Sequence, residues 1–96
     1  TPVPASFALQ QNFPNPFNPV TTISYDVPDR SQVEIVVLDL LGKHVTTLVN
    51  EEVAAGFHST IWNGRDESGR PLGSGTFLVR MKSSSFTAVR KMLLLK

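Results

Sequence analysis

The segment 12–19, which reads Asn-Phe-Pro-Asn-Pro-Phe-Asn-Pro, constrains the fold more than any other stretch of the chain. Each of its prolines fixes φ at about −65° and removes a backbone donor, and each directs the preceding residue to an extended conformation. A helix and a central strand are therefore excluded here. We interpret the segment as a rigid strap whose two rings, Phe13 and Phe17, dock on a core made by the rest of the chain. A proline-rich ligand for an aromatic groove is the alternative.

Short segments with strand patterns follow the strap to the end of the chain. In 22–27, apolar and polar residues alternate, which predicts a half-buried strand. Segment 33–38 is rich in β-branched residues and becomes apolar on both faces, so we place it centrally, with 43–49 as its hairpin partner. The other predicted strands are 57–62, 76–82 and 86–95.

Two segments depart from a simple strand pattern. Residues 50–56 are polar, and we expect a connection that holds a single helical turn at most. In the strand 57–62, Phe57 and Ile61 share one face while Trp62 takes the other, so we expect a bulge or burial on both faces. About seven short strands separated by turns predict an all-β fold, an antiparallel β-sandwich.

Length and composition describe one domain. We interpret residues 1–6, which contain two prolines, as a linker from an upstream domain, and we assign the domain itself to 7–96. Because the chain begins at Thr1, we expect a module of a longer protein. Cysteine is absent, which excludes a disulfide framework and a thiolate metal site. No apolar run approaches the roughly 20 residues of a membrane-spanning helix.

Charge is distributed unevenly along the chain. Residues 1–64 hold two basic and six acidic side chains, a net charge of −4, whereas residues 65–96 hold seven basic and two acidic ones, a net charge of +5. Such asymmetry indicates either an anionic partner for the C-terminal third or strand edges protected by Lys and Arg. We favour the protected edges.

Residues suited to nucleophilic catalysis are sparse. His44 and His58 both lie in strand patterns, and a triad of either with Asp39 or Asp66 and Ser59 lacks the strained turn that exposes a serine nucleophile. We therefore assign both histidines to packing and surface hydrogen bonds. No motif of the chain supports an enzyme.

The other polar and aromatic patterns also favour structural roles. The acid pairs at 51–52 and 66–67 need a cleft to converge on a sugar, which short loops do not provide. Segment 66–69 lacks the alternating carboxylates of an EF-hand, so a plain turn is favoured over a calcium site. Most of the aromatic side chains, those of Trp62, Tyr25 and the phenylalanines, lie at inward parity, so the core is favoured over a carbohydrate platform. Near-neutral net charge disfavours nucleic acid, and we expect no cofactor.

Four motifs in a fixed order resemble a known family. Residues 7–19 with 22–23 resemble the opening of the C-terminal sorting domains of the type IX secretion system, and 37–45 resembles that family's second signature. Residues 62–77 are similar to the related immunoglobulin-like domain of flagellar hook-capping proteins. The ending, 90–96, resembles the basic-apolar-basic ending of sorting domains.

The resemblance implies an immunoglobulin-like sandwich at the C-terminus of a secreted multidomain bacterial protein, often a polysaccharide hydrolase or peptidase. It predicts a non-catalytic module that directs type IX secretion and attachment to the cell surface. The implied partners are the outer-membrane secretion machinery, a sortase-like peptidase that removes the domain in many cases, and the upstream domains of the same polypeptide. Phe13 stands where Tyr is common and Asn63 where Asp is common, and neither affects the fold expectation.

The predicted recognition residues are those of the last strand: Arg90, Lys91, Met92, Leu93, Leu94, Leu95 and Lys96. An apolar strand between basic residues also suits strand addition to a partner, while completion of the core by 92–95 is the alternative. The family motif comprises Asn12, Pro14, Asn15, Pro16, Phe17, Asn18, Pro19, Asp39, Gly42, Lys43, Trp62, Gly64, Asp66, Gly69 and Gly75. The rival function is an accessory binding module, for carbohydrate or for other domains of an extracellular hydrolase.

Overall fold

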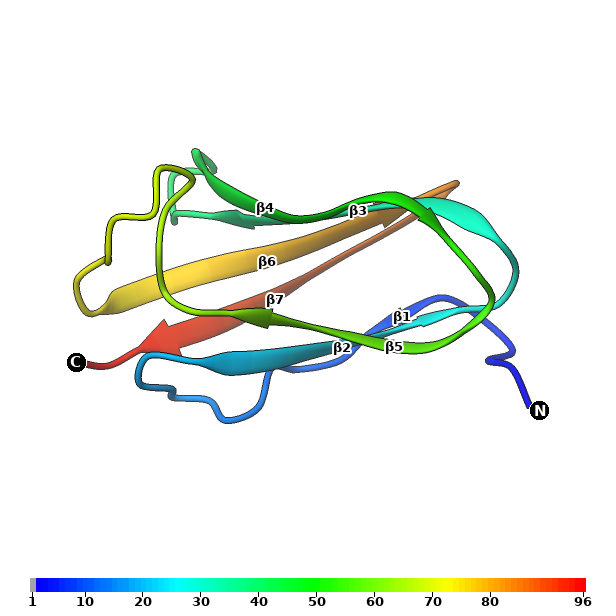
Figure 1. The fold of residues 1–96 in the computed structure, drawn as a ribbon, viewed down its shortest axis with the longest axis horizontal. Coiled ribbons are helices and arrows are strands. Elements are labelled where there is room, and N and C mark those ends of the chain that lie inside the picture. The colour runs from blue at the N-terminus through cyan, green and yellow to red at the C-terminus, as the bar shows by residue number, and fades with distance from the viewer. Residues whose placement is uncertain (1) are drawn as a thin grey trace.

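The computed structural model describes residues 2–96, which form two antiparallel sheets packed face to face (Figure 1). The strands are β1 (Ala8–Leu9), β2 (Thr21–Val27), β3 (Ser31–Leu38), β4 (His44–Val53), β5 (Gly56–Trp62), β6 (Gly75–Ser83) and β7 (Phe86–Leu94). One sheet has the order β1-β2-β5 and the other the order β4-β3-β6-β7. The predicted all-β sandwich of about seven strands is confirmed.

The core lies between the two sheets and follows the period of two that strands impose on their side chains. Along β2, Ile23, Tyr25 and Val27 are buried, and the residues between them lie on the outer face. β3 buries apolar side chains on both faces and lies between β4 and β6, which confirms its predicted central position.

The hairpin partner of β3 is longer than the sequence predicts. A polar connection was expected at 50–56, yet β4 continues to Val53, and Ala54 and Ala55 alone separate it from β5. Strand β4 is an edge strand, and such a strand tolerates polar residues because much of its surface meets water. The expected polar connection is therefore wrong for residues 50–53, since pairing with β3 overrides local composition.

The strand β5 is regular, and the bulge expected in it is wrong. Its register with β2 runs without interruption from the Thr21–Trp62 pair to the end of the strand. Phe57 and Ile61 point outward and are 64% and 62% exposed, whereas Trp62 is 1% exposed in the core. Because two large apolar side chains lie on the solvent side, the alternation could not be recognised from the sequence.

Of the two rings in the strap, Phe17 alone docks on the core. Phe17 is 2% exposed, and its ring centroid lies 5.5 Å from that of Trp62, which in turn meets Phe77 edge-on at 5.3 Å. Phe13 is 79% exposed, so the expectation of burial is wrong for this residue. The cause is register, since Phe13 exchanges two backbone hydrogen bonds of 2.9 Å with Thr22 and so shares its outward face.

The molecule is elongated, with extents of 39 × 23 × 20 Å. Figure 1 shows the N-terminal segment and the C-terminus at opposite ends of the long axis. The strap, the turn from β3 to β4 and the loop from β5 to β6 all lie at the C-terminal end. Most of the family-motif residues therefore gather at one end of the sandwich. The described part of the chain has no helix that is long and apolar enough to cross a membrane.

We expect Phe17→Ala to lower the free energy of unfolding by about 3–5 kcal/mol, because it empties the site of a fully buried ring. Phe13→Ala is the matched control in the same strap and should change that free energy by less than about 0.5 kcal/mol. Equilibrium denaturation in urea measures both values. Equal losses in the two variants would contradict the docking of Phe17 alone.

Candidate functional site

The strap lies along the outer edge of β7, the strand predicted to carry recognition. The Phe17 N–H donates to the Leu93 carbonyl, and the Leu95 N–H donates to the Phe17 carbonyl, both at 2.9 Å. These bonds make a short parallel pairing of Phe17 with Leu94, whose other neighbour is Gly75 at the start of β6. Phe17 therefore holds the last strand through its backbone while its ring fills the core.

Polar side chains extend this contact along β7. Asn15 Oδ1 accepts the Leu93 N–H at 2.9 Å, and Gln11 Nε2 donates to the Lys91 carbonyl at 2.8 Å. Gln11 was not singled out from the sequence, because its partner lies 80 residues away and no local pattern indicates the contact. We call the bonds from residues 11–17 to β7 and Leu95 the clasp.

A buried polar network fixes the bend of the strap. Asn12 is almost completely buried, and its Nδ2 donates to Thr21 Oγ1 at 3.0 Å and to the Pro14 carbonyl at 3.2 Å. Thr21 Oγ1 in turn donates to the Pro14 carbonyl at 2.9 Å. A buried amide requires such partners, since an unpaired polar group away from water is costly. The motif residue Asn12 therefore has a structural role in the strap.

The clasp leaves the predicted recognition residues in different environments. Met92 and Leu94 are fully buried in the core. Arg90 donates from Nε to the Leu9 carbonyl at 3.0 Å and so ties β7 to β1. Arg90 is exposed as well, and so are Lys91, Leu93, Leu95 and Lys96; we call these last four residues the terminal strip.

Strand addition to the C-terminal half of β7, expected from the sequence, is wrong for this structure. The N–H groups of Leu93 and Leu95 and the carbonyls of Lys91 and Leu93 already bond to the clasp. A partner cannot form a sheet ladder with backbone groups that are already paired. Any partner of this region therefore meets side chains.

A hollow of about 360 Å³ opens beside the terminal strip. Its lining combines two amide side chains of the clasp, apolar groups and one ammonium group: Gln11, Asn15, Pro16, Thr76, Lys91, Met92 and Leu93. Apolar walls with a few convergent polar groups are the usual composition of a binding site. This lining suits an apolar group that carries a carboxylate or carbonyl beside it.

A single carboxylate closes the turn between β3 and β4. Asp39 Oδ1 accepts the N–H groups of Leu41 and Lys43, both at 2.9 Å, and the Asp39 carbonyl accepts the Gly42 N–H at 3.0 Å. Gly42 has φ 83°, a left-handed conformation that glycine adopts without strain. Asp39 and Gly42 are therefore the two residues that this turn requires.

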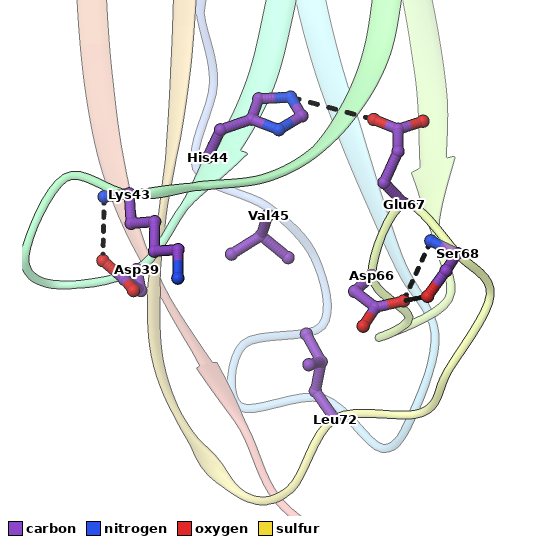
Figure 2. Close-up of a pocket in the computed structure, with 8 residues that line it drawn as sticks. All are labelled: Asp39, Lys43, His44, Val45, Asp66, Glu67, Ser68 and Leu72. Atoms are coloured by element: carbon purple, nitrogen blue, oxygen red, sulfur yellow. Dashed lines mark hydrogen bonds and ion pairs between the residues drawn. The ribbon is translucent and has the colours of Figure 1, made fainter.

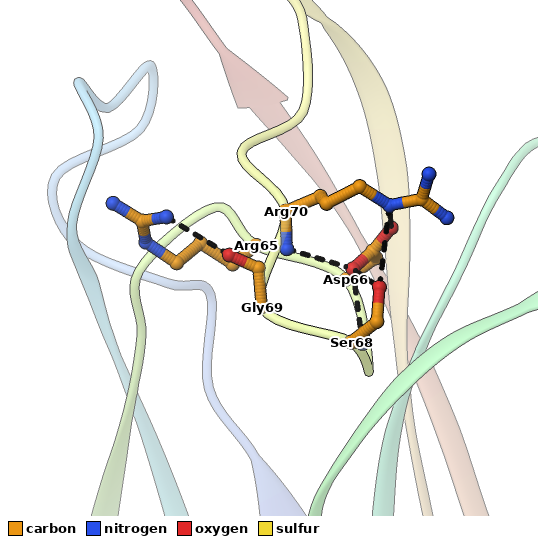
Figure 3. A network of polar contacts seen from close by, with 5 residues as sticks. All are labelled: Arg65, Asp66, Ser68, Gly69 and Arg70. Carbon is orange, nitrogen blue, oxygen red and sulfur yellow. Dashed lines mark hydrogen bonds and ion pairs between the residues drawn. The ribbon is translucent and has the colours of Figure 1, made fainter.

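The loop from β5 to β6 contains a second turn of the same geometry (Figure 3). Asp66 Oδ1 accepts the N–H groups of Ser68 and Arg70, both at 3.0 Å, and the Ser68 hydroxyl at 2.8 Å. The Ser68 hydroxyl and then the Arg70 N–H hold the pKa of the Asp66 carboxyl below its ordinary value. Gly69 has φ 89°. The Asp66 carboxylate therefore serves to close the turn. Residues 2–96 contain no cluster of three metal-ligating side chains.

The same loop is anchored at Trp62 and Gly64. Trp62 Nε1 donates to the Arg65 carbonyl at 3.0 Å. At Gly64, with φ 73°, a Cβ atom would lie 3.1 Å from the Pro19 carbonyl oxygen and 3.5 Å from the Leu94 side chain. This close approach, together with the positive φ, favours glycine where the loop, the strap and the last strand meet.

The two turns line a shared hollow of about 350 Å³ (Figure 2). His44 Nε2 lies 2.8 Å from Thr47 Oγ1 and 3.8 Å from the Glu67 carboxylate, while Asp66 bonds to Ser68. Across the described residues, no hydrogen bond joins His44 to Asp66 or to a serine hydroxyl. The hollow is lined by Asp39, His44 and Asp66, which the sequence analysis weighed for catalysis. Their contacts do not form a triad.

Most aromatic side chains are unavailable to stack on a sugar. Trp62 and Tyr25 are buried, which confirms their assignment to the core. The Tyr25 ring stacks on His58 at 5.5 Å, and burial, with a smaller contribution from a carboxylate on β4, raises the pKa of Tyr25. The phenylalanines were assigned to the core as well, and this is wrong for Phe13 and Phe57, which are exposed.

A comparison with protein-family models matches residues 18–86 to the FlgD Ig-like domain. The chain belongs to the FlgD Ig-like family. The match begins inside the strap and ends at the first residue of β7, so it includes both aspartate turns of this FlgD Ig-like domain but not the terminal strip. No curated protein matches the chain significantly.

Two solved structures share the fold of this FlgD Ig-like domain. PorZ of Porphyromonas gingivalis, an essential surface component of the type IX secretion system, matches with a TM-score of 0.66 and 18% identity over 93% of this chain and 12% of PorZ. FlgD of P. aeruginosa matches with a TM-score of 0.62 and 23% identity over 91% of this chain and 70% of FlgD. At these identities the likenesses show the fold alone, and the predicted immunoglobulin-like sandwich is confirmed.

We expect the stability advantage of the wild type over Asp66→Asn to depend on pH. Because the pKa of Asp66 is lowered in the folded state, its contribution is present above the unfolded-state value of about 3.9 and is lost as the pH falls through the lowered value. Urea denaturation at pH 7 and at about pH 2 measures the difference at each pH. Asp26→Asn removes an equal charge from β2 and controls for net charge. A pKa of Asp66 at or above its ordinary value in an NMR titration would contradict the assignment.

Proposed function

We propose that this domain is a non-catalytic module by which a secreted bacterial protein is recognised for type IX export and then held at the cell surface. The observation that carries the proposal is the terminal strip, in which two ammonium groups and two apolar side chains lie exposed on a strand fixed by the clasp. Its proposed partners are the outer-membrane secretion machinery and a sortase-like peptidase. The domain makes and breaks no bond itself.

Recognition in this proposal acts on the folded domain, because the terminal strip exists only when the clasp has formed. The strip consists of every second residue, Lys91, Leu93 and Leu95, with Lys96 beyond them, while Met92 and Leu94 enter the core. A partner therefore meets a preorganised row of side chains and does not have to order a flexible tail. Preorganisation of this kind reduces the entropic cost of binding.

The position of the strip also suits a signal on a multidomain protein. An upstream domain joined through the proposed linker 1–6 would attach at the opposite end of the long axis from Lys96 (Figure 1). The recognised end would then be clear of the cargo. The likeness to a part of PorZ, which is described as a surface component of the type IX system, supports the link to that machinery.

The second candidate function is an accessory binding module for carbohydrate or for other domains of the parent protein. The exposed rings of Phe13 and Phe57 favour it, because aromatic faces stack on apolar faces of sugars and dock in protein pockets. Burial of Trp62 and Tyr25 argues against a broad aromatic platform.

A reporter protein with residues 1–96 at its C-terminus, expressed in a bacterium with a type IX system, tests the proposed function. Deletion of 90–96 would remove core residues, so the sharper variant is Lys91→Ser with Lys96→Ser, which leaves Met92 and Leu94 in place. We expect the wild type to reach the surface or the medium and the double variant to remain in the periplasm with an unchanged melting temperature.

The matched control is Arg30→Ser with Lys82→Ser, which removes the same charge from exposed positions outside the terminal strip. It should export normally. A wild-type reporter that is folded but trapped in the periplasm would refute the sorting function and favour the binding module. Equal loss of export in both double variants would show that net charge, and not the strip, is recognised.

A further inference from the structure

The four edge strands of the two sheets differ in how far they are covered. The edge of β7 carries the clasp, and β1 has only two residues. Near its start, β4 is capped by the loop from β5, because the Glu67 N–H donates to the Val45 carbonyl at 3.0 Å and Glu67 Oε1 accepts the Thr47 N–H at 3.2 Å. The uncovered parts of β4 and β7 carry the charged residues Glu51, Glu52 and Arg90, and charged side chains protect an edge. The fourth edge is that of β5, which pairs with β2 on one side.

The backbone of β2 shows which groups of β5 face outward. Thr22 exchanges hydrogen bonds with Phe13, and the Ser24 carbonyl accepts the Gln10 N–H, so these residues direct their backbone groups away from β5. The alternate residues of β2 therefore bond to β5, at its positions 56, 58, 60 and 62. The N–H and C=O groups of Phe57, Ser59 and Ile61 are consequently directed to the open edge.

The strand β5 lacks the features that usually protect such an edge. Its sequence, Gly56 to Trp62, contains no lysine, no acidic residue and no proline, and its register with β2 has no bulge. Its outward side chains include the exposed Phe57 and Ile61. A regular, uncharged and apolar edge is a template for pairing with another strand.

We propose that β5 pairs antiparallel with β5 of a second copy of this chain and so joins two three-stranded sheets into one. With the two-fold axis at Ser59, Ser59 faces Ser59 of the second copy, and Phe57 faces Ile61 in both directions. All three outward-directed residues then form hydrogen-bonded pairs, in each of which the two residues exchange both bonds. The register is therefore self-complementary, as a two-fold interface requires.

Side-chain chemistry favours the same occupant. Each Phe57–Ile61 pair places an aromatic ring beside a β-branched side chain, which is a favourable cross-strand combination. Thr22 lies beside Ile61 and Phe13 beside Thr22, so the second copy's Phe57 would extend an exposed row that already exists. Because β5 carries no lysine, arginine or acidic side chain, self-pairing brings no fixed like charges together along the strand.

Sedimentation velocity over a concentration series tests the pairing. A contact made by one strand edge is small for a specific interface, so we expect a dissociation constant on the order of 100 μM and measure up to about 1 mM. Ser59→Lys should abolish the dimer, because it places two ammonium groups opposite each other at the axis. Ser24→Lys is the matched control, since Ser24 is the register partner of Ser59 on the same sheet but lies on the central strand. It should still dimerise.

A charge swap and a cross-link distinguish this register from other contacts. Ser59→Lys and Ser59→Glu should each be monomeric, and their equimolar mixture should form a heterodimer. Ser59→Cys introduces the sole cysteine of the chain, and hydrogen-bonded antiparallel residues have a Cα separation of about 5.5 Å, which a disulfide spans. Mild oxidation should therefore link Ser59→Cys, and not Ser24→Cys, into a covalent dimer.

The proposal is overturned if the wild type remains monomeric at about 1 mM, a concentration at which even weak specific contacts are populated. It is also overturned if Ser24→Lys disrupts association as strongly as Ser59→Lys, because the contact would then be through the sheet face and not its edge. Since neither serine belongs to the terminal strip, these outcomes are independent of the secretion experiment.

Discussion

The burial of Phe17 is the contact on which the rest of the structure depends. Its ring lies against Trp62 between the sheets, while its N–H and C=O hold Leu93 and Leu95 of the last strand. One residue therefore joins the strap, the core and the C-terminal end. Without it, the edge of β7 would be open, and the terminal strip would have no fixed position. The prolines around it restrict the backbone of the strap, which limits the entropy lost when it docks.

The loops at the C-terminal end and the strands of the two sheets satisfy their backbone groups by different means. At the C-terminal end, side-chain oxygens take the place of secondary structure, since Asp39 and Asp66 each close a turn through backbone N–H groups that would otherwise need water. Along the sheets, the clasp covers the C-terminal half of the β7 edge and the loop from β5 to β6 caps the start of β4, whereas no such cover lies along β5. The basic side chains of the C-terminal third fit the expected role at strand edges in the case of Arg90, which bonds to the Leu9 carbonyl. Lys91 and Lys96 remain exposed and are the ones to which we assign recognition.

The sequence predicted the fold well and the site less well, for reasons that individual residues make clear. Alternation in β2 and the apolar run in β3 depend on neighbours along the chain, so both were predicted correctly. The docking of Phe17 but not Phe13 depends on the register with Thr22, which no local pattern specifies. The contacts of β7 with Gln11 and Asn15 join residues far apart in sequence, so the occupied edge could not be foreseen. Phe57 and Ile61 were misleading because burial was inferred from hydrophobicity.

The pairing of Phe17 with Leu94 is parallel, and the N-terminal segment and the C-terminus lie at opposite ends of the long axis. A load applied between the N-terminal segment and the end of β7 would therefore act along these two segments in opposite directions. Their hydrogen bonds lie across the line of force, so several bonds must break together and cannot open one after another. The prolines restrict the backbone dihedral angles of the strap, so the strap cannot lengthen by local rearrangement. The clasp thus gives this small sandwich mechanical resistance along its long axis.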